Sequence, residues 1–214
     1  MFLVVLYIIG ISAEAMSAAL VAGRHKMDLV GVLFIALAAA IGGGSVRDML
    51  FDLYPLTWVA HPQYVVIVCL AALLTTLIPR VIARLEKLFL ALDALGLVVF
   101  AVIGAEAVRA AGHGAILVVC GAVITAVFGG VLRDIFCGVV PLVFRKELYA
   151  FVGILTGLLY WILVECGLSI NISSLIALIS GFALRMVAIH YRLGMPIFSY
   201  EDKTPPNSPK ISQK

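Results

Sequence analysis

A short motif with an arginine and an aspartate occurs twice in this chain. The segment GGSVRDMLFDLYPL starts at Gly43 and GGVLRDIFCGVVPL starts at Gly129, with Gly, Gly, Arg, Asp, Pro and Leu in common. The charged residues of the two copies are Arg47 with Asp48 and Arg133 with Asp134. A charge at the centre of a bilayer costs about 3 kcal/mol, so such groups usually face a bundle interior or an aqueous path. We therefore expect each pair either to face a pore or stabilise a gate, or to close a local salt bridge where its helix ends.

Glycines precede both pairs. They are Gly42, Gly43 and Gly44 in the first copy and Gly129 and Gly130 in the second. Each glycine weakens a helix by about 1 kcal/mol relative to alanine, so both helices can break or kink here. The freed carbonyl oxygens could replace part of the hydration shell of potassium or sodium. The alternative is that these small residues only let helices pack closely.

Two further acidic residues could line a path for cations. Glu14 lies well inside the first apolar run, and Asp93 lies about one turn inside the fourth. Glu14 could instead hydrogen-bond to a neighbouring helix or snorkel, and Asp93 could bond a basic residue near the cytoplasmic face. Arg185, near the end of the last apolar run, is expected to snorkel to the membrane surface.

The sequence does not indicate catalysis, nucleotide binding or a stable metal site. No nucleophile, base and orienting group occur together, so the sequence does not indicate an enzyme. The motif GGxxRDxL also resembles the nucleotide-binding signature of poly(A) polymerases and CCA-adding enzymes, but here both copies end apolar runs and no DxD pair precedes them. We expect no cofactor, no nucleic-acid partner, and no metal beyond transient contacts with monovalent cations. The cysteines lack metal-ligand spacing and are expected to be reduced packing residues: Cys69, Cys120, Cys137 and Cys166.

The composition requires a lipid environment. Of the 214 residues, 64% are hydrophobic and only 13% are charged, which is far from the balance of soluble domains. Apolar runs of about twenty residues recur, and each can cross a bilayer as a helix. They predict an all-α membrane protein with seven transmembrane helices, near 1–22, 28–50, 62–79, 88–108, 114–136, 147–165 and 169–190.

The basic residues predict the orientation. One set of connecting segments contains most of them: Arg24, Lys26, Arg80, Arg84, Lys87, Arg145, Lys146, Arg192, Lys203, Lys210 and Lys214. The opposite face has little beyond Arg109 and Arg47. By the positive-inside rule, the N-terminus is outside and the C-terminus is cytoplasmic.

The two motif copies belong to a longer internal repeat. An offset of 86 positions aligns them and also pairs Gly10 with Gly96 and Ala36 with Ala122. Each repeat holds three spans, so the second enters the membrane from the opposite side and the repeats are inverted. The expected organisation is a first three-helix repeat (1–86), a second, inverted repeat (87–168), a seventh transmembrane helix (169–194) and a disordered cytoplasmic tail (195–214) rich in Pro, Ser and Lys.

Taken together, residues 2–190 resemble the prokaryotic trimeric intracellular cation (TRIC) channel family, also catalogued as small inner-membrane proteins with two glycine-transporter-type domains. The resemblance rests on the two repeats, the seventh span, GGGSVRD at Gly42–Asp48 and FGGVLRD at Phe128–Asp134. It implies a multi-pass protein of the cell inner membrane that forms a homotrimer. It also implies a potassium-permeable pore in each protomer, lined by the kinked second and fifth spans, with the Arg–Asp pairs beside it. Phe128 replaces a third glycine, so the second kink is expected to be stiffer.

Three functions are compatible with the residues themselves. The first is a passive channel for potassium or sodium ions. The second is a secondary transporter of a small solute such as glycine, which would use the same inverted repeats to alternate access. The third is a membrane scaffold whose glycines serve only helix packing. The family resemblance favours the channel.

Overall fold

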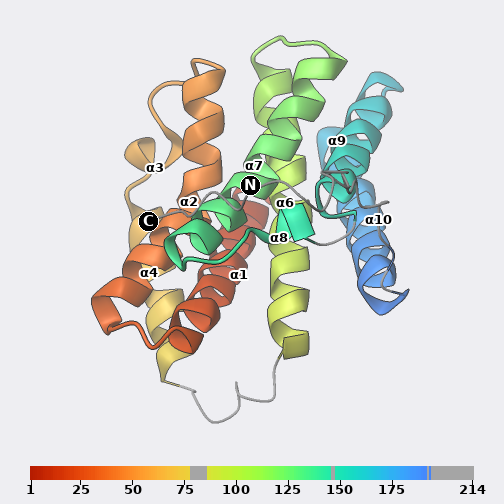
Figure 1. Cartoon of the computed structure of the whole chain (residues 1–214). Helices are drawn as coiled ribbons and strands as arrows, with labels where there is room; N and C mark the ends of the chain where they lie inside the picture. The colour runs from red at the N-terminus through yellow and green to blue at the C-terminus, as the bar shows by residue number, and fades with distance from the viewer. Residues whose placement is uncertain (78–85, 146–147, 192, 194–214) are drawn as a thin grey trace, which may run out of the picture.

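The computed structural model describes residues 1–77, 86–145, 148–191 and 193. The regular elements in this part of the chain are nine α-helices (Figure 1). They are α1 (Phe2–Arg24), α2 (Leu29–Leu50), α3 (Thr57–Ala60), α4 (Gln63–Thr76), α6 (Glu86–Ala110), α7 (Ala115–Phe136), α8 (Leu142–Arg145), α9 (Tyr149–Glu165) and α10 (Ile170–Tyr191). The all-α class predicted from the sequence is therefore confirmed.

Five helices are long and apolar enough to cross a membrane: α1, α2, α6, α7 and α10. The apolar helices α4 and α9 are shorter, at 14 and 17 residues. Each of the seven predicted spans matches one of these helices within a few residues at each end. The number of membrane crossings and the orientation of the termini stay predictions. The expected tail (195–214) lies outside the described residues.

The two short helices α3 and α8 were not indicated by the apolar pattern. Each contains four residues and follows one of the Arg–Asp motifs along the chain. Four-residue helices carry no readable periodicity, which is why sequence reasoning passed over them. Their position after the motifs is the first sign that the motifs organise the chain that follows them.

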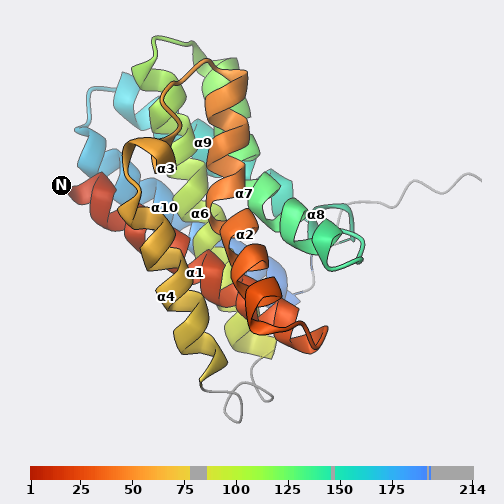
Figure 2. The ribbon, with the colours of Figure 1, turned by 90° about the vertical axis from the view of Figure 1, so that its left-hand side faces the viewer.

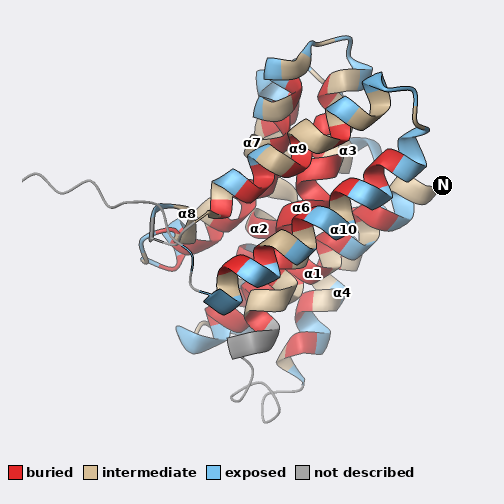
Figure 3. Cartoon of the chain, turned by 90° about the vertical axis from the view of Figure 1, so that its right-hand side faces the viewer, coloured by how far each residue is buried: buried red, intermediate tan, exposed pale blue. Residues whose placement is uncertain are grey.

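Helices α1 and α6 are the most buried of the five long apolar helices and lie at the centre of the molecule. Helix α1 contacts α2, α4 and α6, while α7 packs against α2, α6 and α9 (Figure 2). Helix α10 lies at one edge, against α6 and α9. Figure 3 shows the consequence: buried residues line the inward faces, whereas exposed residues cover the outer faces and the connections. Most of the core consists of alanine and valine, which allows these helices to approach closely.

The two repeats are related in structure as well as in sequence. Helices α2 and α7 are offset by 86 residues at both ends, and α2 ends where α7 begins, at the top of Figure 1. They also cross reciprocally. A Cβ atom on Gly43 would lie 2.5 Å from the carbonyl oxygen of Thr125, and one on Gly129 would lie 2.2 Å from that of Ala39. Such reciprocal pairs, each offset by 86 residues, are what a two-fold relation between the repeats produces.

Candidate functional site

Arg133 lies at the centre of a buried cluster of charged side chains, which we name the Arg133 cluster: Glu14, Asp93, Arg133 and Asp134. Its Nε atom donates to Asp134 Oδ1 at 2.8 Å. Its Nη1 atom donates to Asp93 Oδ1 at 2.9 Å and to Glu14 Oε1 at 3.3 Å. All four side chains are almost completely shielded from solvent. Three carboxylates therefore share one guanidinium group inside the bundle.

Three helices contribute to the cluster. Glu14 comes from α1, Asp93 from α6, and Arg133 with Asp134 from the last turn of α7. The hydroxyl of Ser17, one turn after Glu14, accepts a further hydrogen bond from Arg133 Nη1 at 3.1 Å. The ring of Phe89 covers the guanidinium carbon at 5.3 Å from its centroid. One arginine thereby connects helices that are far apart in the sequence.

The cluster is bordered by α9 and α10. Tyr149 on α9 is buried and lies within electrostatic range of Glu14, Asp93 and Arg133. The guanidinium carbon of Arg185, on α10, lies 4.6 Å from the centroid of the Tyr149 ring, a cation–π contact. Arg185 is 2% exposed, so the expectation that it snorkels to the surface is wrong. The contact with the Tyr149 ring is one interaction that stabilises this arginine inside the bundle.

Asp134 also fixes the chain that follows α7. Its Oδ2 atom accepts a hydrogen bond from the backbone N–H of Leu142 at 2.9 Å, and Leu142 is the first residue of α8. A carboxylate at a helix N-terminus satisfies a free N–H group and interacts favourably with the helix dipole. Beside it, a narrow pocket is lined by Val127, Gly130, Val131, Arg133, Asp134, Leu142, Val143 and Tyr149.

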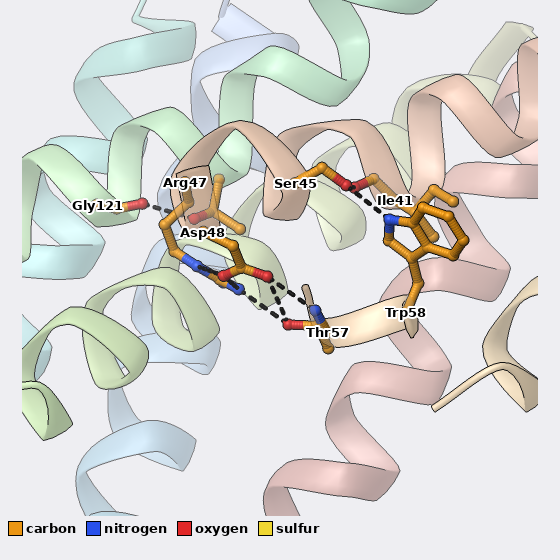
Figure 4. Close-up of polar contacts among 8 residues, drawn as sticks. Ile41, Ser45, Arg47, Asp48, Thr57, Trp58 and Gly121 are labelled. Carbon is orange, nitrogen blue, oxygen red and sulfur yellow. Dashed lines mark hydrogen bonds and ion pairs between the residues drawn. The ribbon is translucent and has the colours of Figure 1, made fainter. Parts of the chain in front are cut away.

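The first Arg–Asp pair makes the same local contacts but fewer distant ones (Figure 4). Arg47 Nε donates to Asp48 Oδ1 at 2.9 Å, and Nη2 donates to the same oxygen at 2.5 Å. Asp48 Oδ2 accepts from both the backbone N–H and the hydroxyl of Thr57, at 2.9 Å each. Thr57 is the first residue of α3. Asp48 therefore anchors α3 as Asp134 anchors α8.

Helix α3 has a second anchor. Trp58 Nε1 donates to Ser45 Oγ at 3.1 Å, and Ser45 in turn donates to the carbonyl oxygen of Ile41 at 2.9 Å. Figure 4 shows this chain of contacts beside the Arg47–Asp48 pair. The segment after the first motif is thus bound by side chains from two consecutive turns of α2.

The residues that surround the two arginines differ between the repeats. The 86-residue offset pairs Asp93 with Tyr7 and Glu14 with Phe100. Tyr7 contacts the ring of Phe100 at 6.3 Å between centroids and lies within electrostatic range of Arg47. Aromatic side chains thus occupy, beside the first motif, the positions that hold carboxylates beside the second. Among the described residues, a buried cluster of several acidic groups forms at the second motif and not at the first.

The glycines lie where α2 and α7 cross. The backbone contacts at Gly43 and Gly129 leave no room for a side chain. Gly42 faces the side chain of Leu132, Gly44 lies near Arg47, and Gly130 lies near Tyr149 and Arg133. Both helices continue through their glycines without interruption, so the expectation that they break here is wrong. Close packing against the partner helix compensates for the low helix propensity of glycine. A kink without a break stays a prediction.

The structure brings together most of the site residues proposed from the sequence. Glu14 and Asp93 meet at the second Arg–Asp pair, and the glycines meet at the helix crossing. Sequence reasoning missed the partly buried contact in which Glu106 accepts hydrogen bonds from Arg109, at 2.8 and 3.0 Å, and from the hydroxyl of Tyr160. The spacing of Glu106 and Arg109, one turn apart, was the available signal.

The part of the chain that the structure describes contains no obvious set of ligands for a metal ion. No three His, Cys, Asp or Glu side chains there converge as ligands of a metal ion. The three carboxylates of the Arg133 cluster converge on a guanidinium group instead. The four cysteines are free thiols.

Comparison with known proteins places the chain in a family. The family described as glycine transporter matches it twice, at residues 4–80 and 90–165. The UPF0126 inner membrane protein YadS of Escherichia coli K12 is 34% identical over 197 residues, which is 91% of this chain and 95% of the relative.

Solved structures share the fold. One, described as the structural basis for conductance through TRIC cation channels, has a TM-score of 0.85 and 32% identity, covering 92% of this chain and 98% of that one. The TRIC orthologue of Rhodobacter sphaeroides has a TM-score of 0.85 and 30% identity, covering 89% and 98%. The fold and the duplicated motif thus define a multi-pass integral protein of the inner membrane. The chain belongs to the prokaryotic TRIC channel family, whose repeated domain is the one described as glycine transporter.

Proposed function

We propose that this protein is a channel for monovalent cations, permeable to potassium. The likeness to solved structures titled as TRIC cation channels carries the proposal, since it extends over 92% of the chain at 32% identity. The assembly would be a homotrimer with one pore in each protomer. Two inverted three-helix repeats, 1–86 and 87–168, would build each protomer, and α10 would lie outside the duplication.

The pore would pass the crossing of α2 and α7. Here backbone carbonyls of both repeats, from Ala39 and Thr125, lie opposite glycines of the other helix. In the continuous helices these oxygens accept hydrogen bonds from the N–H groups one turn on, so a local opening at the glycines would free them to replace water around a permeating cation. In the described conformation the two backbones are in contact at this point, so the helices would have to separate for ions to pass. The Arg–Asp pairs, which hold α3 and α8 at the ends of these helices, would lie beside the pore.

A second candidate is a secondary transporter of a small solute such as glycine. The description of the family as glycine transporter is the specific observation that favours it. Inverted repeats serve carriers as well as channels, because they allow a central site to open to either side. The rate of transport separates the two possibilities.

Single-channel recording of the purified protein in planar bilayers tests the proposal. Under a potassium gradient we expect discrete openings whose current far exceeds the turnover of a carrier. A glycine gradient serves as the control. A silent bilayer, together with saturable glycine uptake into liposomes, would establish the carrier and overturn the channel.

A variant at the helix crossing tests the position of the pore. Replacing both Gly43 and Gly129 with leucine is expected to abolish transport while the protein still inserts into the membrane. Gly23→Leu is the matched control, because nothing lies within 4 Å of a Cβ atom at that position. An unchanged potassium flux in the double variant would exclude this crossing as the pore.

A further inference from the structure

The Arg133 cluster contains more negative than positive charge. Three carboxylates, from Glu14, Asp93 and Asp134, surround the guanidinium group of Arg133. Arg185 on α10 adds a second buried positive charge behind the ring of Tyr149. Among the side chains that the structure describes, the charged groups that face the cluster from α1, α6, α7 and α10 sum to one negative charge if all are ionised, and α9 presents the neutral Tyr149.

A more distant arginine does not remove this excess. The guanidinium carbon of Arg24, at the end of α1, lies over the Phe89 ring, 5.5 Å from its centroid. Its side chain is exposed, so solvent compensates its charge and screens its effect on the interior. An uncompensated charge inside the bundle is unfavourable unless a counter-charge accompanies it.

One oxygen atom of the cluster is available for such a counter-charge. Asp93 is fully buried and uses Oδ1 to bind Arg133. Its Oδ2 atom has no hydrogen-bond partner among the described residues. Glu14 lies beside it, because both carboxylates accept from the same nitrogen, Arg133 Nη1. A water molecule could satisfy the hydrogen bond of Asp93 Oδ2, but it could not cancel the charge.

The excess of buried negative charge occurs beside the second motif and not beside the first. The equivalent positions beside Arg47 hold Tyr7 and Phe100 in place of Asp93 and Glu14, and there one guanidinium group is matched by one carboxylate. The shared architecture of the motif therefore does not require the two additional acids. Their presence beside Arg133 needs another explanation.

We propose that the Arg133 cluster holds one exchangeable monovalent cation, either an alkali ion or a proton, at the carboxylates of Asp93 and Glu14. The ion supplies the missing positive charge and a partner for Asp93 Oδ2. Its binding is an equilibrium property of the folded protein, so the site does not depend on whether ions pass through the molecule.

Thermal unfolding of the purified protein in detergent tests the site. The midpoint is measured in potassium chloride and in choline chloride at equal ionic strength, from about pH 5 to about pH 9. A bound ion stabilises the folded state by mass action, so removing it is expected to lower the midpoint by roughly 3 °C or more. If the ion is potassium, the midpoint falls in choline at constant pH. If it is a proton, the midpoint falls as the pH rises, equally in both salts.

Matched variants test whether the dependence of the unfolding midpoint on the ion arises at the Arg133 cluster. Asp93→Asn keeps the shape of the side chain and removes one negative charge, and it is expected to abolish the dependence on the ion. Glu14→Gln is a second route to the same result if Asp93→Asn does not fold. Glu165→Gln removes an exposed carboxylate on α9 and is expected to behave as the unchanged protein. The proposal is overturned if the midpoint of the unchanged protein responds to neither ion, or if both cluster variants keep the full response.

Discussion

The two Arg–Asp motifs share one local structure and differ in what surrounds it. In both, the arginine binds the neighbouring aspartate, and the aspartate holds the first residue of a short helix, Thr57 or Leu142. Beyond that, Arg133 reaches carboxylates on α1 and α6, whereas aromatic rings stand at the equivalent positions near Arg47. Duplication preserved the anchor for the short helix, and divergence made only the second motif a junction between helices.

This difference indicates distinct roles for the two arginines. Arg47 joins α2 to α3, which are neighbours along the chain. Arg133 joins α7 to both α1 and α6, so it adds a charged connection between the two repeats to the helix packing that holds them together. Asp48 of the first motif is compensated locally by Arg47 and by hydrogen bonds from Thr57, whereas Arg133 of the second is also compensated by carboxylates from other helices.

The largest expected effect comes from removing the arginines. Arg133→Met leaves three buried carboxylates without their shared partner, and breaking a buried pair in this way costs about 3–5 kcal/mol. Arg47→Met leaves one carboxylate that still accepts two hydrogen bonds from Thr57, so we expect a loss nearer to 1–2 kcal/mol. The free energy of unfolding in detergent measures both. Equal losses would remove the distinction between the motifs.

A smaller effect is expected at the helix crossing, where the two repeats are alike. Gly43→Ala and Gly129→Ala each place a Cβ atom against a backbone carbonyl of the other helix, and overpacking of this kind costs about 1–3 kcal/mol. The reciprocal geometry predicts similar losses of stability for the two variants. Gly23→Ala, at an open position, is the control and is expected to leave stability unchanged or slightly raised. A neutral Gly129→Ala would show that the backbones are not in contact.

The smallest effect concerns the anchor of α3. Thr57→Val removes the hydroxyl that donates to Asp48 and accepts from Arg47 but keeps the backbone hydrogen bond. We expect a loss of about 1 kcal/mol. Thr76→Val is the matched control, since its hydroxyl bonds only to the exposed carbonyl of Leu73. If the two variants lose the same stability, the Thr57 hydroxyl contributes nothing specific to the motif.

Much of the fold could be read from the sequence. Apolar runs of about twenty residues have few alternatives to long helices, so the seven predicted spans coincide with observed helices. The 86-residue offset found in the motifs also gives the matching ends of α2 and α7. The packing between the helices could be predicted less well. Glycine propensity, which describes isolated helices, suggested a break, but the contact between α2 and α7 decides the local structure.

The composition of the Arg133 cluster could be predicted only in part. Glu14, Asp93 and Arg133 were each identified as candidates because charges in apolar runs need partners. Their contacts join residues that are 119 and 40 positions apart, and the packing of α1, α6 and α7 decides which charges meet. The sequence does carry one signal of the cluster: the offset of 86 pairs Asp93 and Glu14 with Tyr7 and Phe100, which marks the second motif as different from the first.

A pair of double-mutant cycles tests this distinction most directly. One cycle combines Arg133→Met with Asp93→Asn, and the other combines Arg47→Met with Tyr7→Phe at the equivalent positions. For residues in direct contact within one network, interaction energies reach about 0.5–3 kcal/mol. We expect about 2 kcal/mol or more for the Arg133–Asp93 pair, and less than about 0.5 kcal/mol for Arg47–Tyr7. Equal interaction energies in the two cycles would contradict the conclusion that only the second motif joins the helices of both repeats through buried charges.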